Sequence, residues 1–365
     1  MKIATLTLPL HPNYGAVLQA YALQKALQEL GHDVYSINIT RSSLRTLPRN
    51  IISSIKRVIK TGKILDNHNY GNPKFATFIK AELNLTKKLY FQKDFYRLDI
   101  QNFDAYIVGS DQVWRPKYTI DIKRFFLDFI PNDKIKISYA ASFGTEDNEY
   151  SIHNINYCKN ALKSFKAVSV REKNGIQKCK ELFDVLSTHV LDPTLLINSQ
   201  VYVNLIKKYP SKIPAKKVVC YLLDSNTEKV NIINETFSEP YYINENSDDT
   251  NKIGIIEWLK LFYESDTIIT DSFHGMVFSI IFQKRFVAIG NNARGLDRFV
   301  SLLHQLNLNQ HLIIDSNLSK EKLLEKALIT PDHNQVQFLL ENYRNTSYSF
   351  INDNISNYND KFTSQ

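Results

Sequence analysis

The feature that most constrains the fold is a regular alternation between short apolar runs and longer amphipathic stretches. Near the start, an apolar run at residues 2–8 is followed by a helical pattern at 16–30 and a second apolar run at 33–39. A strand, a helix and a strand in this order form the repeating unit of a parallel sheet with right-handed crossovers. The chain is therefore expected to have an α/β fold.

The same alternation divides the 365-residue chain into two sets of elements. The first continues with strands at 105–108, 135–140, 167–170 and 188–191 and helices at 153–163 and 173–182. The second has strands at 218–223, 241–243, 267–269 and 286–289 and helices at 227–237, 254–264 and 276–282. The polar stretch 199–217, with Pro210 and Pro214, separates the two sets. We expect an N-terminal α/β domain at 1–200, a C-terminal α/β domain at 201–346 and a loosely ordered tail at 347–365.

Composition excludes several classes of protein. No apolar run approaches the roughly 20 residues that span a bilayer, and Pro9 and Pro12 interrupt the first run too early for a signal peptide. The three cysteines are odd in number and widely spaced, which matches neither a disulfide framework nor a metal site. A cytoplasmic location is therefore expected.

The net charge of +8 is concentrated in residues 41–98, where 13 Lys and Arg face three Asp and Glu, an excess of 13 − 3 = +10. Isoleucines and a valine recur there at helical spacing over 51–59, with basic residues between them. The pattern predicts a basic amphipathic helix. Such a helix could lie on an anionic membrane surface, giving a peripheral location at its inner face, or could cover the molecule as an ordinary solvated helix. A nucleic-acid partner is not expected, because no recognisable binding motif accompanies the charge.

A histidine stands at a predicted junction between a strand and a helix. The β-branched run 267–269 is followed by Asp271 and Ser272, either of which could cap a helix, and then by His274. In open α/β sheets ligands bind at this edge, and the free amides of a helix N-terminus attract anions. The alternative is a capping loop in which the His274 side chain has only a packing role. Asp271 could serve either as the helix cap or as a partner that orients the histidine.

Six further segments resemble the polysaccharide pyruvyl transferase family and occur in that family's order. They are NYGAVLQAYALQ at 13–24, VGSDQVW at 108–114, SYAASFG at 138–144, SVRE at 169–172, LDPTLL at 191–196 and TDSFHG at 270–275, followed by an arginine-containing stretch that ends at Arg298. The resemblance covers most of the chain. It implies two Rossmann-like domains that face each other across a cleft, as in GT-B glycosyltransferases.

The resemblance also implies an activity, the transfer of pyruvate from phosphoenolpyruvate onto a sugar of a cell-surface polysaccharide precursor to form a ketal. No metal or organic cofactor is implied. The acceptor could be a free, nucleotide-linked or lipid-linked sugar. Two rival functions stay open: a glycosyltransferase of the same shape, for which no glycine-rich phosphate loop is present, and a non-catalytic sugar-binding protein of the same fold.

The reaction needs an acid to protonate the enol carbon and cations to hold the carboxylate and the phosphate of the donor. His274 is the expected acid. Arginine suits the donor because its planar fork makes two hydrogen bonds with such groups. Arg171 directly follows a predicted strand, and Arg294 lies in the loop after another, with Arg298 as its near rival. Together with Ser272, these arginines are expected to bind the donor.

The expected acceptor site lies at the ends of two strands in the first domain. It comprises Asn13, Tyr14 and Gly15 after the first strand and Asp111 after the strand at 105–108. An acidic side chain would repel phosphoenolpyruvate, so Asp111 suits a sugar hydroxyl better. The plainer alternatives are a tight turn with a packed tyrosine at 13–15 and a capping or turn role for Asp111.

Overall fold

The computed structural model describes residues 1–41, 43–44, 72–243, 252–291 and 295–355. Arg294 and the isoleucine stripe at 51–59 lie outside the described residues, so what the sequence indicates for them stays a prediction. Among the residues that are described, no helix is long and apolar enough to cross a membrane.

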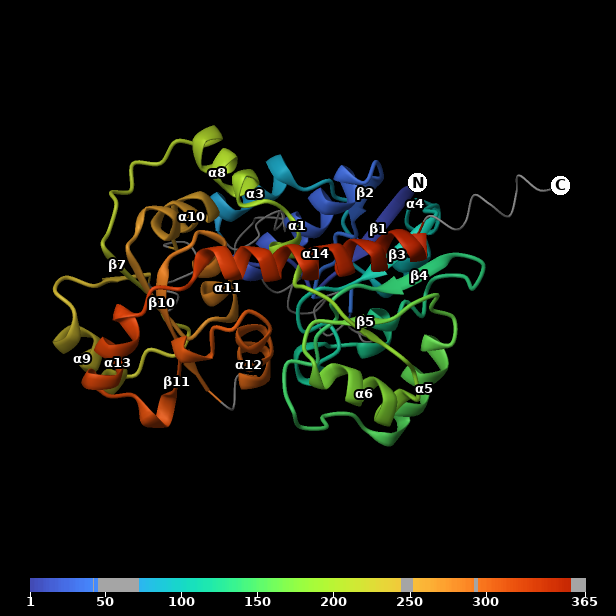
Figure 1. Cartoon of the computed structure of the whole chain (residues 1–365). Helices are drawn as coiled ribbons and strands as arrows, with labels where there is room; N and C mark the ends of the chain where they lie inside the picture. Colours follow the sequence, from blue (N-terminus) through green and yellow to red (C-terminus); the bar gives the residue numbers. More distant parts are fainter. Residues whose placement is uncertain (42, 45–71, 244–251, 292–294, 356–365) are drawn as a thin grey trace, which may run out of the picture.

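The first domain is built on a four-stranded parallel sheet in the order β2-β1-β3-β4, shown from blue to green in Figure 1. The strands are β1 (Lys2–Leu6), β2 (Asp33–Ser36), β3 (Ala105–Val108) and β4 (Ile135–Ser138). A short parallel pair, β5 (Ser169–Val170) and β6 (Thr188–His189), extends it through isolated bridges from β4 and from the residues that follow it. The helices of this domain are α1 (Tyr14–Glu29), α3 (Pro73–Glu82), α4 (Leu98–Gln101), α5 (Ile152–Leu162) and α6 (Asn174–Phe183), with 3-10 turns η1 (Gln92–Tyr96), η2 (Pro116–Tyr118) and η3 (Ile122–Phe126).

The second domain has a five-stranded parallel sheet in the order β11-β10-β9-β7-β8. Its strands are β7 (Val218–Tyr221), β8 (Tyr241–Tyr242), β9 (Thr267–Thr270), β10 (Arg285–Gly290) and β11 (Leu312–Ile314). The helices are α9 (Thr227–Thr236), α10 (Ile255–Glu264), α11 (Phe273–Ile281), α12 (Leu296–Gln305) and α13 (Lys320–Leu328), with 3-10 turns η5 (Asn309–His311) and η6 (Asp315–Asn317). Every pairing in both sheets is parallel, which confirms the α/β fold expected from the sequence.

The sequence did not predict β11, α12 and α13, and two further segments differ from the sequence-based expectation. The first is the start of the polar stretch 199–217 that was expected to separate the two sets: it forms helix α8 (Ser199–Lys208), because Asn198 caps the helix and its apolar face is buried. The short helix α7 (Pro193–Leu196) precedes it. The last described element is the long helix α14 (His333–Ile355), which crosses from the second domain back over the first (Figure 1). The predicted tail boundary at 347 thus falls inside a helix. There the Ser347 hydroxyl oxygen accepts a hydrogen bond from the Leu191 amide at 3.1 Å.

The two domains share a hydrophobic core. At its centre the ring of Tyr14, from the first turn of α1, stacks on Trp258 of α10 with the ring centroids 5.3 Å apart, and meets Tyr221 of β7 edge-on. The Tyr14 hydroxyl donates to the Ile253 carbonyl at 3.0 Å. This packing fixes the start of α1 against the second domain and so determines where the two sheets' carboxyl edges meet.

Candidate active site

His274 lies where the sequence predicted it, in the first turn of a helix that follows a buried strand. β9 is β-branched and wholly buried, and α11 begins at Phe273. Ser272 is the cap: its hydroxyl oxygen accepts a hydrogen bond from the Gly275 amide at 3.3 Å. The histidine side chain is 10% exposed. This placement directs the imidazole from the second domain toward the first.

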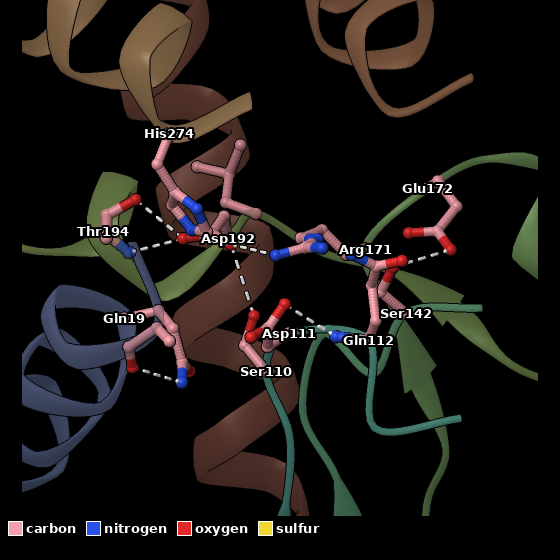
Figure 2. Close-up of polar contacts among 12 residues, drawn as sticks. Gln19, Ser110, Asp111, Gln112, Ser142, Arg171, Glu172, Asp192, Thr194 and His274 are labelled. Atoms are coloured by element: carbon pink, nitrogen blue, oxygen red, sulfur yellow. Dashed lines mark hydrogen bonds and ion pairs between the residues drawn. The ribbon is translucent and has the colours of Figure 1, made fainter. Parts of the chain in front are cut away.

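The imidazole meets a carboxylate of the first domain, that of Asp192 (Figure 2). The Asp192 Oδ2 atom lies 3.6 Å from His274 Nε2 and 2.9 Å from an Arg171 terminal nitrogen, and it also accepts from the Ser110 hydroxyl at 3.2 Å. Its other oxygen accepts from the Thr194 hydroxyl at 2.6 Å and from the Thr194 amide at 3.0 Å. Asp192 therefore joins the histidine of one domain to the arginine of the other.

The Asp192 carboxylate is charged despite being almost fully buried. Burial alone would raise its pKa, but its contacts with His274, Arg171 and Thr194 outweigh burial and hold the pKa well below the usual value. A buried anion fixed in this way orients both the imidazole and the guanidinium. In the sequence Asp192 stood out only as part of the LDPTLL segment at 191–196; its position shortly after β6 and directly before the proline that starts α7 was the available signal for a site residue.

Arg171 follows β5, and part of its guanidinium has no hydrogen-bond partner among the described residues. One terminal nitrogen is engaged by Asp192, while Nε and the other terminal nitrogen are buried and have no hydrogen-bond partner among the described residues. Leaving buried donors unpaired costs free energy, so a guanidinium in this state suits an anionic ligand. The alternative pairing with Glu172 that the sequence allowed is not formed. Glu172 instead accepts hydrogen bonds from the Phe143 and Gly144 amides.

A second guanidinium, that of Arg298 on α12, lies close to the first. The Arg171 and Arg298 guanidinium carbons are 4.7 Å and 5.6 Å from the centroid of the same ring, that of Phe273. Burial, with the neighbouring Arg171 charge, lowers the pKa of Arg298 to about 10, which leaves it charged at neutral pH. The Asp111 carboxylate acts in the opposite direction on both arginines. Two cations held together near a histidine favour a polyanionic ligand between them.

The first turn of α1 completes the surroundings of the imidazole. A Cβ atom built on Gly15 would lie 2.0 Å from His274 Nδ1, so only glycine leaves room for the ring. Asn13 caps α1 by accepting from the Ala16 amide at 2.9 Å, and Tyr14 is fully buried. For these two residues the structure favours the capping and packing alternatives over direct contact with an acceptor.

Asp271 has neither of the roles that the sequence offered for it. Its carboxylate accepts hydrogen bonds from the Leu223 amide at 2.6 Å and the Asp224 amide at 3.1 Å, and it pairs with Lys229 at 3.2 Å. The cap is Ser272, and the carboxylate beside His274 is Asp192.

Asp111 lies after β3 with a positive φ of 66°, and its side chain accepts a hydrogen bond from the Gln112 amide.

The fold is that of GT-B enzymes with two Rossmann-like domains. Anabaena Alr3699/HepE in complex with UDP-glucose is similar over 97% of this chain and 100% of its own, with a TM-score of 0.53 at 9% identity. Arabidopsis thaliana UGT89C1 is similar over 98% of both chains, with a TM-score of 0.50 at 11% identity. At these identities the likeness concerns the fold alone.

Sequence comparison identifies the family more narrowly. No curated protein matches the chain in sequence. The sequence model of the polysaccharide pyruvyl transferases matches residues 13–293, which include the first turn of α1, Arg171, Asp192 and His274. This match covers well over half of the chain and agrees with the six segments noted in the sequence. The chain belongs to the polysaccharide pyruvyl transferase family.

Proposed function

We propose that this protein transfers pyruvate from phosphoenolpyruvate to two hydroxyls of a sugar in a cell-surface polysaccharide precursor, acting in the cytoplasm. The observation that carries the proposal is that the buried guanidinium of Arg171 and the half-buried guanidinium of Arg298 contact one ring, that of Phe273, which directly precedes His274 at the mouth of α11. Phosphoenolpyruvate carries its carboxylate and its phosphate on the same carbon, C2, so two cations that contact one aromatic ring match its two anionic groups.

In this proposal the two arginines and the start of α11 hold the donor. The unpaired nitrogens of Arg171 would bind one anionic group of phosphoenolpyruvate, and Arg298 the other. Ser272 and the amides of the first turn add the positive end of the helix dipole. Arg294, outside the described residues, is the further candidate for this role from the sequence.

His274 would act as the general acid. Its proton passes to C3 of phosphoenolpyruvate, the π electrons form the new C–H bond, and C2 becomes electrophilic. One sugar hydroxyl then forms a C–O bond to C2, the bond between C2 and the phosphate oxygen breaks, and a second hydroxyl closes the ketal. The two hydroxyl protons balance the reaction, one restoring the imidazolium and the other leaving with phosphate. The charged Asp192 would stabilise the protonated imidazole throughout.

The acceptor would approach from the first domain. Asp111 remains the candidate there for orienting a sugar hydroxyl, while Gly15 leaves the space that the imidazole occupies. The proposal has three versions, which differ in the carrier of the acceptor sugar: the sugar is free, linked to a nucleotide or linked to a lipid.

The test is to mix the purified protein with phosphoenolpyruvate and a panel of glycosides, including nucleotide-linked and lipid-linked forms, and to measure phosphate release. Release that requires both the donor and one acceptor supports transfer. Release of a nucleotide from a nucleotide sugar, without consumption of phosphoenolpyruvate, would contradict the proposal in favour of glycosyl transfer. Binding of sugars with no turnover of either donor would contradict it in favour of a sugar-binding protein.

A further inference from the structure

The second domain contains a cavity of about 420 Å³ at the carboxyl edge of its sheet, within the size range of small-molecule sites. Three parts of the chain line it: the start of α9, the end of β10 and the turn η6 after β11. The polar lining consists of Asn226, Glu228, Lys229, Asn291, Asp315 and Ser316. Of the described residues assigned above to the donor or to the acid, none is part of this lining.

The charge of the cavity disfavours anions. The Lys229 ammonium is 1% exposed and is paired with Asp271 at 3.2 Å and with Asp315 at 3.3 Å, so both carboxylates neutralise it. Glu228 is exposed and adds a third negative charge. Among the described lining residues, the two carboxylates of Glu228 and Asp315 face one buried ammonium, so the described part of the lining is net negative. A phosphate, a nucleoside diphosphate or phosphoenolpyruvate would be repelled there.

The remaining chemistry of the cavity suits a neutral ligand rich in hydroxyls. The Glu228 and Asp315 carboxylates are acceptors for hydroxyl protons, and the Ser316 hydroxyl can both donate and accept. Ile232, Ile314 and Leu318 provide apolar walls against which the C–H face of a sugar ring can pack. Carboxylates with an apolar wall therefore select an uncharged sugar over an anion.

Two segments of the chain, the one after β9 and the one after β10, link the cavity to the active site. Asp271, which holds Lys229, directly precedes Ser272, the cap of the helix that carries His274. Asn291, in the lining, begins the connection from β10 to α12, which carries Arg298. A ligand in the cavity would thus contact Lys229, which is paired with the residue before the cap of α11, and Asn291, which follows the end of β10.

We propose that this cavity binds an uncharged sugar unit of the acceptor, and so selects a neutral saccharide for the reaction. The proposal rests on the proposed function for its biological meaning, but the binding itself can be measured without phosphoenolpyruvate. The substrate class is a saccharide with at least one neutral unit in addition to the hydroxyl pair that receives pyruvate.

The test uses the full chain, without phosphoenolpyruvate, and the methyl glycosides of glucose, galactose, mannose, N-acetylglucosamine and N-acetylmannosamine, titrated by ligand-observed NMR. Ser316→Trp fills the cavity, and Glu228→Gln removes a charged acceptor. Asn317→Trp is the matched control, because Asn317 is exposed in the same turn but does not line the cavity. Phosphoenolpyruvate affinity, from calorimetry, reports whether each variant keeps an intact active site.

At least one glycoside is expected to bind the wild-type protein. Ser316→Trp and Glu228→Gln are each expected to weaken it by about tenfold or more, the scale of a lost hydrogen bond to a charged group. Asn317→Trp should change it by less than about twofold. All three variants should bind phosphoenolpyruvate as the wild type does, because the cavity lies outside the donor site.

Three results would overturn the proposal: no glycoside of the panel binds the wild type, the bound glycoside is unaffected by Ser316→Trp, or uridine diphosphate or inorganic phosphate binds and is displaced by that substitution. The last result would make the cavity an anion site. A failure of the proposed function is recognised separately, as glycoside binding that depends on Ser316 in a protein that never releases phosphate from phosphoenolpyruvate.

Discussion

Gly15 and His274 come from opposite domains, and the imidazole occupies the space that a side chain at position 15 would fill. A Cβ atom there would lie 2.0 Å from Nδ1 and 2.4 Å from Cγ of the ring. Position 15 therefore requires glycine because the His274 ring approaches the backbone closely, and not because the backbone there has an unusual φ angle. The same turn is held against the second domain by Tyr14, so the gap for the ring is fixed by the core.

Gly15→Ala should consequently displace the imidazole and lower turnover by about a hundredfold, close to the loss of a general acid, while the core retains its packing. Phosphate release and thermal unfolding are the two measurements. Gly31→Ala is the matched control: its φ is +82°, so alanine is strained there, but no atom lies within 4 Å of the added Cβ. The control should lose stability and keep its turnover; equal turnover in Gly15→Ala and wild type would show that the ring position does not matter.

Asp192→Asn should destabilise the protein strongly, because it leaves the buried Arg171 guanidinium without its counter-charge. Breaking a buried ion pair by removing one partner costs about 3–5 kcal/mol. Since the folded protein lowers the pKa of Asp192, the stability it contributes is present above the ordinary pKa of about 4 and is lost as pH falls below it. Urea unfolding at pH 7 and at about pH 2.5 should show a difference in unfolding free energy between wild type and variant that is smaller at the lower pH. A gap of the same size at both values would contradict a charged Asp192.

Arg171 and Arg298 should contribute separately to donor affinity. Replacing Arg298 with Ala should weaken phosphoenolpyruvate binding by about 1.5–3 kcal/mol, the scale of a hydrogen bond to a charged group, and Arg298→Lys should recover only part of it. Arg171→Lys tests the other position while retaining a cation beside Asp192. Calorimetric titration gives the affinities. Unchanged affinity in both Arg298→Ala and Arg171→Lys would move the donor site elsewhere.

The Asp297 carboxylate of α12 forms a hydrogen bond to the first domain, and its contribution to stability should depend on pH. Its carboxylate accepts a hydrogen bond from the Asn174 side-chain amide of α6. Burial raises the pKa of Asp297 to about 7, and the Glu146 and Glu172 carboxylates add to this. A raised carboxyl pKa gives stability that is fully present below the ordinary pKa and is lost as pH rises through about 7. Asp297→Asn, which can still accept the bond, should therefore raise Tm relative to wild type by about 2 °C at pH 8 and not at pH 4. A Tm difference independent of pH would contradict this titration.

The two parallel sheets could be predicted from the sequence because each buried strand is a short apolar run with turn signals at both ends. The strand expected at 105–108 is β3, Ala105–Val108, and most other elements differ from expectation by one to a few residues at their ends. Helix α8 was taken for a linker because it is polar and is followed by Pro210, although Tyr202, Val203 and Leu205 bury one face. Helix α14 is similarly polar, and its docking on the first domain is a long-range contact that local patterns do not encode.

The candidate site was predictable where a local pattern sufficed. A strand that runs into a capped helix identified His274, and an arginine directly after a strand identified Arg171. Asp192 was missed because its partners are distant in sequence, and no periodicity links residue 192 to residue 274. Conversely, Asn13 and Tyr14 were drawn into the acceptor site by their position in a loop after a strand, whereas tertiary packing gives them capping and core roles.

The most direct measurement follows the carbon atoms of the donor. Phosphoenolpyruvate labelled with 13C at C2 is incubated with the acceptor found in the phosphate-release panel, and the product is examined by NMR. The wild-type protein should place the label in a ketal carbon bonded to two sugar oxygens, and a folded His274→Ala variant should do so at least about a hundredfold more slowly. Label that stays in phosphoenolpyruvate or appears only as free pyruvate with the wild type, or ketal formed at the same rate by the variant, would contradict the account.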